Sequence, residues 1–198
     1  ALYRAKEQGR NNYQLFDEQM HREALTSMLL ENELRAALAA DEFVLHYPPK
    51  VSLQSGQLTG VEAMIRWNAP ELGMVPPGNF IPMLEQTGLI YEVGRWALRQ
   101  AIGDHLRWRA AGLMPLRIAV NVSPLQLRHR GFVSEVQQVI GTNGAACAGL
   151  ELEITESMIM EDVEHSIQSL DAIRKMGVSV AIDDFGTGFS SLSHIAKL

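Results

Sequence analysis

Two adjacent carboxylates, Asp183 and Asp184, follow an apolar segment near the end of the chain. Acid or amide side chains also stand at or near the ends of three earlier apolar segments, at Glu62, Asn121 and Glu153. Oxygen ligands without His or Cys suit hard ions such as Mg²⁺ or Mn²⁺ rather than zinc. The adjacent aspartates could serve two ions about 3.5–4 Å apart, the usual arrangement for attack on a phosphodiester. These residue types therefore indicate metal-assisted phosphodiester chemistry.

Two further side chains accompany this set. Arg66 lies four positions after Glu62, on the same face of a strand, and its guanidinium could hold a phosphate oxygen. Glu156 follows Glu153 at the start of the next segment. Taken singly, each acid would more often be a helix N-cap or, like Asp184 before Gly-Thr-Gly, a turn former. Taken together they favour a binding site, because a buried carboxylate is costly unless it is paired or bound to a metal.

The first of these residues lies in a predicted hairpin. The segments "EFVLHYPPKVSL" and "QLTGVEAMIRW" are both typical of strands, and only a short turn with Ser55 and Gly56 separates them. A parallel pair needs a crossover of a dozen or more residues, so these two strands must be antiparallel. Pro48 and Pro49 cannot donate to a ladder, so the first strand is interrupted there or lies at an edge.

The other residues lie on strands that alternate with helices. A long helical stretch follows Asn79, with Gly94 as the weak point between two segments and Gly112 as its stop. Further strands are expected at 116–123, 150–155 and 178–183, and helices at 1–8, 17–40, 125–140 and 161–176, the last of them capped by Gly177. This alternation with short linkers implies a parallel α/β sheet. In such sheets the functional groups lie at the carboxyl ends of the strands.

The composition limits the classes of partner. The 198 residues carry a formal net charge of -6, which disfavours nonspecific binding to DNA, RNA or an anionic membrane surface. One cysteine, Cys147, cannot form an internal disulfide, so a reducing compartment such as the cytoplasm is expected. No apolar run approaches the ~20 residues of a membrane span, although a longer parent protein could be anchored elsewhere.

Five motifs resemble those of the EAL-domain family in order and spacing: "GVEAMIRW", "FIPMLEQTGLI", "NVSPLQL", "LELEITES" and "AIDDFGTGFSSL". The resemblance covers residues 41–198. It implies a modified (β/α)₈ (TIM-like) barrel with an antiparallel first strand, of which about the first five strands are present. It also implies a phosphodiesterase that opens the bacterial second messenger cyclic di-GMP to linear pGpG.

The resemblance also implies a role for each candidate residue. The expected ligands of the metal ions, Mg²⁺ or Mn²⁺, are Glu62, Asn121, Glu153, Asp183 and Asp184. Asp183 would be shared between two ions, and the catalytic set would be Glu62, Asp183 and Asp184. Arg66 would contact a phosphate of the substrate, and Glu156 would brace the loop after Asp184. That loop, residues 185–191, resembles the segment that links the metal site to a homodimer interface in the family.

The chain departs from the family pattern at several places. The name-giving motif reads Glu-Ala-Met, a volume-conserving change at Met64. Pro48 replaces a ligand-contacting glutamine, which should weaken or reshape nucleotide binding, and Phe189 replaces a tyrosine. The family continues beyond Leu198 with lysine- and glutamate-bearing strands that complete the second metal site. We therefore expect a C-terminally truncated domain that is inactive by itself.

The N-terminal residues have a resemblance of their own. "ALYRAKEQGRNNYQLFD" is similar to the tail of a GGDEF (diguanylate cyclase-like) domain, which places this tail at 1–16 and an interdomain linker helix at 17–40. Two alternatives to a phosphodiesterase stay open. The domain could be an inactive cyclic di-GMP receptor, or the fragment could persist as an oligomer that covers an open sheet edge.

Overall fold

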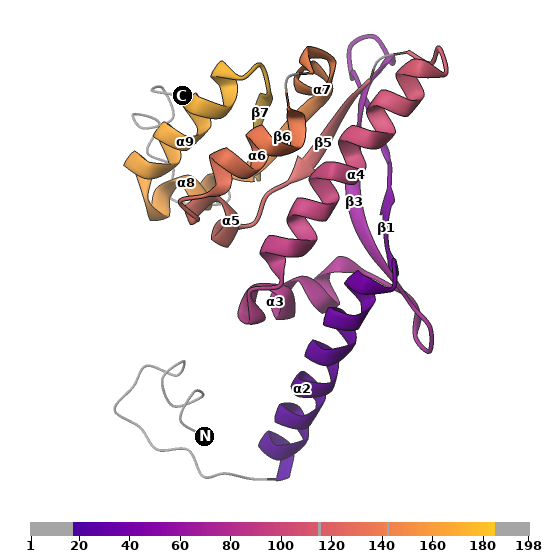
Figure 1. Cartoon of the computed structure of the whole chain (residues 1–198), viewed down its shortest axis with the longest axis vertical. Helices are drawn as coiled ribbons and strands as arrows, with labels where there is room; N and C mark the ends of the chain where they lie inside the picture. The colour runs from indigo at the N-terminus through magenta and orange to yellow at the C-terminus, as the bar shows by residue number, and fades with distance from the viewer. Residues whose placement is uncertain (1–17, 115, 142, 185–198) are drawn as a thin grey trace.

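A computed structural model describes residues 18–114, 116–141 and 143–184 (Figure 1). The predicted helix at 1–8, the GGDEF-like tail and the loop at 185–191 lie outside these ranges. The strands are β1 Phe43–His46, β2 Pro49–Val51, β3 Leu58–Ala69, β4 Gly73–Val75, β5 Arg117–Asn121, β6 Leu150–Thr155 and β7 Ser179–Asp183. The helices are α2 Glu18–Ala39, α3 Pro77–Thr87, α4 Ile90–Ala110, α5 Pro124–Arg128, α6 Phe132–Ile140, α7 Gly144–Gly149, α8 Glu156–Glu161 and α9 Val163–Lys175.

The predicted hairpin is confirmed. Both β1 and β2 pair antiparallel with β3, with Phe43 opposite Trp67 and Pro49 opposite Val61. The first strand is interrupted at Tyr47, as the two prolines require. The short strand β4, which the sequence did not predict, returns along β3 through Gly73, whose positive φ of 69° suits a tight turn.

Strands β3, β5, β6 and β7 pair parallel with one another, and the strand order of the sheet is β1-β3-β5-β6-β7. Alternate residues of these strands face opposite sides of the sheet. The apolar side chains of one side, among them Ile118, Val120, Leu152 and Ile154, pack under α4, α6, α7 and α9. The other side carries Glu62, Asn121, Glu151 and Glu153. The described strands form an open sheet, as expected from five strands of a barrel.

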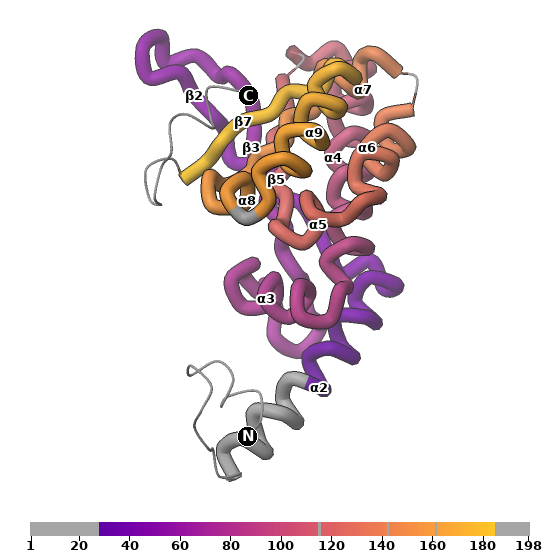
Figure 2. Tube along the Cα trace, turned by 90° about the vertical axis from the view of Figure 1, so that its left-hand side faces the viewer, coloured from indigo at the N-terminus to yellow at the C-terminus, as the bar shows by residue number. Residues whose placement is uncertain are grey.

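A second apolar core joins the first helices to the hairpin. Leu34 of α2, Phe80 of α3 and Val93 of α4 pack with Phe43 and Trp67. The indole Nε1 of Trp67 donates a hydrogen bond to Glu42 Oε2 at 3.0 Å, so its polar atom is satisfied. The last turns of α2 lie beside α3 (Figure 2), and α2 extends away from the sheet (Figure 1). No helix in the described part of the chain is long and apolar enough to span a bilayer.

Two helix predictions were wrong in detail. The long helical stretch breaks at Gly88, which has a positive φ of 76°, and Gly94 lies inside α4. A Cβ at Gly94 would come within 2.1 Å of Nε2 of Gln126, so this glycine permits the approach of α5 to α4. The expected helix at 125–140 is divided into α5 and α6, which end and begin around His129. The expected stops hold, since Gly112 and Gly177 both have positive φ just after α4 and α9.

Candidate active site

Four neighbouring strands bring the predicted oxygen ligands to one side of the sheet. Asn121 is the last residue of β5 and lies opposite Glu153 of β6. Its amide Nδ2 donates a hydrogen bond to Glu62 Oε1 of β3 at 2.7 Å. Asp183 ends β7, opposite Thr155 of β6. The parallel register thus gathers side chains separated by more than a hundred positions on one side of the sheet. Asn121 and Asp183 end their strands, whereas Glu62 lies within β3.

Glu153 is the most deeply placed of these acids, with 7% of its surface exposed. Burial raises the pKa of its carboxyl, and the neighbouring charges of Glu62 and Asp183 raise it further. The ammonium of Lys50 opposes the shift, because its Nζ donates to Glu153 Oε1 at 2.5 Å. Glu62 and Asp183 lie on the same side of the sheet as Glu153, so their negative charges favour its neutral form.

Lys50 was not predicted from the sequence. It lies on β2, and besides Glu153 it contacts Glu151 Oε1 at 2.9 Å, while Arg117 approaches Glu151 at 4.0 Å. Burial alone would lower the pKa of Lys50, but the hydrogen bonds to Glu153 and Glu151 outweigh it, so the pKa is raised. The available signal in the sequence was that Lys50 belongs to a strand-like segment, and that this segment was predicted to pair with the strand that carries Glu62. Its partners, more than a hundred residues later, could not be identified from the chain.

The two aspartates lie at the turn where β7 ends. Both are exposed, and the backbone N–H of Asp184 donates to Asp183 Oδ1 at 2.9 Å. Asp184 has a positive φ of 53°, which is uncommon for a residue with a side chain and is a feature of functional turns. The carboxyl end of β7 thus presents two exposed carboxylates, as the sequence predicted.

The two accessory residues are placed differently. Arg66 is half-buried on β3, where its Nη1 donates to the backbone oxygen of Ile65 at 2.9 Å and its Nη2 lies 3.6 Å from Sδ of Met64. Glu156 is the first residue of α8 and is 2% exposed. The loop that it is predicted to brace lies outside the described residues.

The donor set fits Mg²⁺ or Mn²⁺ in its chemistry, since it offers carboxylate and amide oxygens and a buried acid that needs a cation. Across residues 18–114, 116–141 and 143–184, no three His, Cys, Asp or Glu side chains are gathered closely enough to hold an ion as they stand. An ion would therefore have to draw the carboxylates together, and Glu153 would have to release Lys50.

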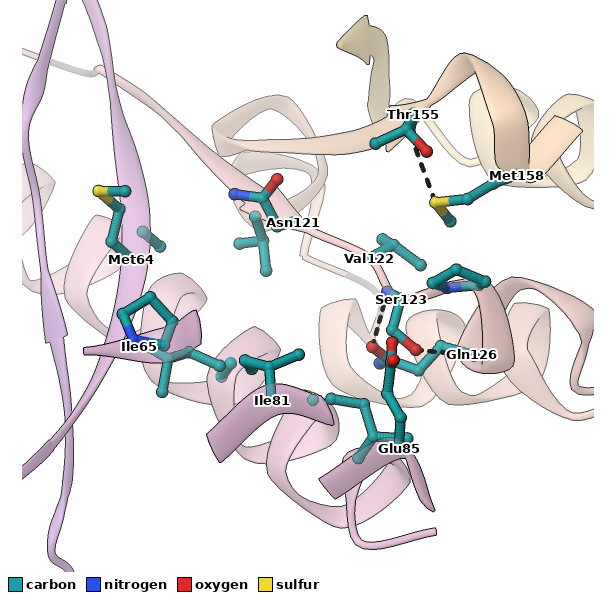
Figure 3. A pocket seen from close by; sticks show the side chains of 17 residues that line it. Met64, Ile65, Ile81, Glu85, Asn121, Val122, Ser123, Gln126, Thr155 and Met158 are labelled. Atoms are coloured by element: carbon teal, nitrogen blue, oxygen red, sulfur yellow. Dashed lines mark hydrogen bonds between the residues drawn. The ribbon is translucent and has the colours of Figure 1, made fainter. Parts of the chain in front are cut away.

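A pocket of about 360 Å³ adjoins Asn121 (Figure 3). In this view Asn121 lies between Met64 of β3 and Thr155 of β6, above apolar side chains of β3 and α3. At its floor Ser123 and Gln126 form a capping box at the start of α5, with Ser123 N–H donating to Gln126 Oε1 at 3.1 Å. The volume lies within the range of small-ligand pockets, and the lining is mostly apolar with a few polar groups.

The sheet has an antiparallel first strand followed by parallel strands, and one side of it carries several carboxylates. These features are typical of an α/β barrel protein with a candidate metal site. The sequence pattern of the EAL domain matches residues 31–198, so the chain belongs to the EAL domain family. It is 42% identical over its full length to the bifunctional diguanylate cyclase/cyclic di-GMP phosphodiesterase MucR of Pseudomonas aeruginosa, and 36% identical to the cyclic di-GMP phosphodiesterase PdeR of Escherichia coli. The chain spans 29% and 30% of the length of these two relatives.

Solved structures agree with this assignment. The Pseudomonas aeruginosa MucR phosphodiesterase in complex with c-di-GMP superposes with a TM-score of 0.82 at 42% identity, covering 86% of this chain and 69% of that one. The FimX EAL domain of Xanthomonas citri in complex with c-diGMP gives a TM-score of 0.78 at 25% identity, covering 90% and 69%. EAL domains are TIM-like barrels, so the predicted fold class is confirmed, with part of the barrel present here.

Proposed function

We propose that this chain is the substrate-binding and metal-binding part of a phosphodiesterase that hydrolyses cyclic di-GMP to linear pGpG. The observation that carries the proposal is that Glu62, Asn121, Glu153 and Asp183 lie on one side of the sheet, with Asn121 hydrogen-bonded to Glu62 and opposite Glu153. The named phosphodiesterases among its relatives support the substrate. The activity belongs to the longer protein that contains the chain.

We assign one ion to Glu62, Asn121, Glu153 and Asp183, and a second to Asp183 and Asp184, with further ligands contributed by residues beyond 198. When bound, such ions polarise phosphoryl oxygens and lower the pKa of a coordinated water. Glu62 is held for this task by the amide of Asn121. The carboxylate of Asp183 is held by the backbone N–H of Asp184, which donates to its Oδ1. Magnesium or manganese suits these donors.

Substrate positioning falls to Arg66 and the pocket beside Asn121. The guanidinium of Arg66 can exchange its present acceptor, the backbone oxygen of Ile65, for a phosphate group. Two of its N–H groups could then donate to two phosphate oxygens. The pocket is large enough for part of a dinucleotide and offers the apolar walls that nucleobases prefer. Glu156, buried at the start of α8, supports the loop after Asp184.

We also propose a neighbouring domain, an oligomeric state and a cellular compartment for this protein. A GGDEF-like domain precedes the chain, residues 1–16 are its tail, and residues 17–40 link the two domains. The protein acts in the cytoplasm, a reducing compartment that the single cysteine of the chain favours. It acts as a homodimer, as the family resemblance implies.

A cyclic di-GMP receptor without hydrolytic activity is the second candidate. Two observations favour it: Pro48 stands where the family has a ligand-contacting glutamine, and Lys50 occupies an oxygen of Glu153. A receptor binds the nucleotide tightly without metal, whereas a phosphodiesterase needs the ions for turnover.

The two candidates are separated by one assay. Full-length protein is incubated with cyclic di-GMP and Mg²⁺ or Mn²⁺, and linear pGpG is measured by chromatography. A phosphodiesterase forms pGpG, loses this activity with a chelator, and loses it again in Glu62→Gln. Tight nucleotide binding in calorimetry with no pGpG at high protein concentration would establish the receptor and reject the enzyme.

A further inference from the structure

The acidic edge of the sheet contains a cation supplied by the chain itself. Lys50 Nζ donates to Glu153 Oε1 at 2.5 Å and to Glu151 Oε1 at 2.9 Å, across 103 and 101 positions of sequence. The Glu153 side chain is 9% exposed and that of Lys50 36% exposed. The Glu153 end of the contact is therefore withdrawn from water, and the attraction between opposite charges is stronger there than between two fully exposed groups.

The position of this ammonium conflicts with a metal ion. Glu153 can give the same oxygen to Lys50 or to a divalent cation, and two positive charges at that point repel each other. Without either cation, Glu153 would lie buried near the carboxylates of Glu62 and Asp183 without compensation, which is costly. One cation or the other therefore stabilises its charged form.

We propose that Lys50 is a displaceable counter-ion of the metal site: it holds Glu153 in the metal-free protein and pairs with Glu151 alone when an ion binds. The inference rests on the proposed metal site and adds a positioning residue to it. Lys50 competes with the ion and does not ligate it, because an ammonium is a donor only.

The second acceptor makes this exchange possible without movement of a strand. Glu151 lies two residues before Glu153, on the same face of β6, and it already accepts a hydrogen bond from Lys50. Arg117 of β5 lies 4.0 Å from the other oxygen of Glu151. A rotation of the Lys50 side chain therefore frees Glu153 and leaves the ammonium paired.

A purely structural role for Lys50 makes the opposite prediction. If Lys50 only kept Glu153 in place for the ion, its removal would misplace a ligand and weaken metal binding. If Lys50 is displaced by the ion, its removal eliminates a competitor and strengthens metal binding. The sign of the change in metal affinity decides between the two roles.

The test is a calorimetric titration of the full-length protein with Mn²⁺ in the absence of nucleotide. Lys50→Met should bind Mn²⁺ about tenfold more tightly than wild type, the size expected for loss of one charged hydrogen bond that competes with binding. Lys50→Arg keeps the charge and should stay within about twofold of wild type. Arg117→Met is the matched control, because it removes a nearby cation that does not touch Glu153.

Thermal melting gives a second readout. Without metal, Lys50→Met should melt below wild type, and Mn²⁺ should raise its Tm by more than that of wild type. Lys50→Gln replaces Lys50→Met if the latter does not fold, with the same expected direction. Equal or weaker Mn²⁺ binding in the variant overturns the role of Lys50 and leaves the metal site standing, whereas absence of Mn²⁺ binding in both proteins overturns both proposals.

Discussion

The amide nitrogen of Asn121 donates a hydrogen bond of 2.7 Å to the carboxylate of Glu62, which lies 59 positions earlier on the neighbouring strand. This bond leaves the amide oxygen of Asn121 available and fixes one oxygen of Glu62. The amide oxygen of Asn121 and the second carboxylate oxygen of Glu62 could therefore bind the same metal ion from adjacent parallel strands.

Asn121→Leu should therefore weaken Mn²⁺ binding by about 10–100-fold, because it removes one ligand and the group that orients another. The fold should persist, since Asn121 is exposed. Titration calorimetry with Mn²⁺ measures the change. Asn68→Leu is the matched control on the same sheet, and an equal loss there would show that the effect is not specific to the site.

Arg66→Ala should raise the KM for cyclic di-GMP by about tenfold, because a charged hydrogen bond to phosphate is worth on the order of 1.5–3 kcal/mol. Its Mn²⁺ affinity should not change, because in the structure Arg66 contacts Ile65 and Met64 and none of the acids. Steady-state kinetics with the full-length protein measure KM. A variant with normal KM would remove Arg66 from the substrate site.

Gly94→Ala should lower the free energy of unfolding by about 1–3 kcal/mol, the usual cost of overpacking. The new Cβ would meet the Gln126 side chain at 2.1–2.9 Å. Gly103→Ala is the control in the same helix α4, where nothing lies within 4 Å, and it should stabilise the protein by up to about 1 kcal/mol. Urea unfolding of both variants measures the difference, and a neutral Gly94→Ala would contradict the close packing of α4 on α5.

Gly94 also illustrates what a sequence can reveal. A glycine within a helical pattern was interpreted as a break, because glycine is a poor helix former. The reason for Gly94 lies instead in Gln126, a residue on another helix, and no local pattern connects the two. The antiparallel hairpin was predictable because a two-strand connection with a short turn leaves no other geometry.

Some features of the candidate site could likewise be predicted from the sequence, and others could not. The place of Glu62, Asn121 and Glu153 on one face of the sheet was predictable from period-two alternation, and their role as ligands stays a prediction. The rule that parallel strands present function at their carboxyl ends fits Asn121 and Asp183, whereas Glu62 lies within β3. The pairing of Lys50 with Glu151 and Glu153 was not, because it depends on where β2 lies relative to β6 in the folded protein.

Tyr47 should give the protein an alkaline limit to its stability. Burial raises the pKa of its hydroxyl from 10.0 to about 12, with Arg107 opposing, and the hydroxyl donates to Asp104 Oδ2 at 2.5 Å. The folded state thus retains a proton that the unfolded chain loses first. The stabilisation is complete below pH 10 and is lost as the pH rises toward 12.

Tyr47→Phe should lack this part of the pH dependence, at a cost of about 1.5–3 kcal/mol at neutral pH for the lost hydrogen bond to a buried carboxylate. Denaturant unfolding of wild type and variant between pH 9 and roughly pH 12 measures the difference. Parallel pH profiles of the two proteins would show that Tyr47 ionises normally.

The most direct test of the metal site is an anomalous-difference map from crystals of the full-length protein grown with Mn²⁺. The account predicts a peak at the edge of the sheet, about 2.0–2.6 Å from oxygens of Glu62, Asn121, Glu153 and Asp183. The ammonium of Lys50 should then have left Glu153 and kept Glu151. Ordered density for these four side chains with no peak between them, or a peak elsewhere, would contradict the proposed metal site.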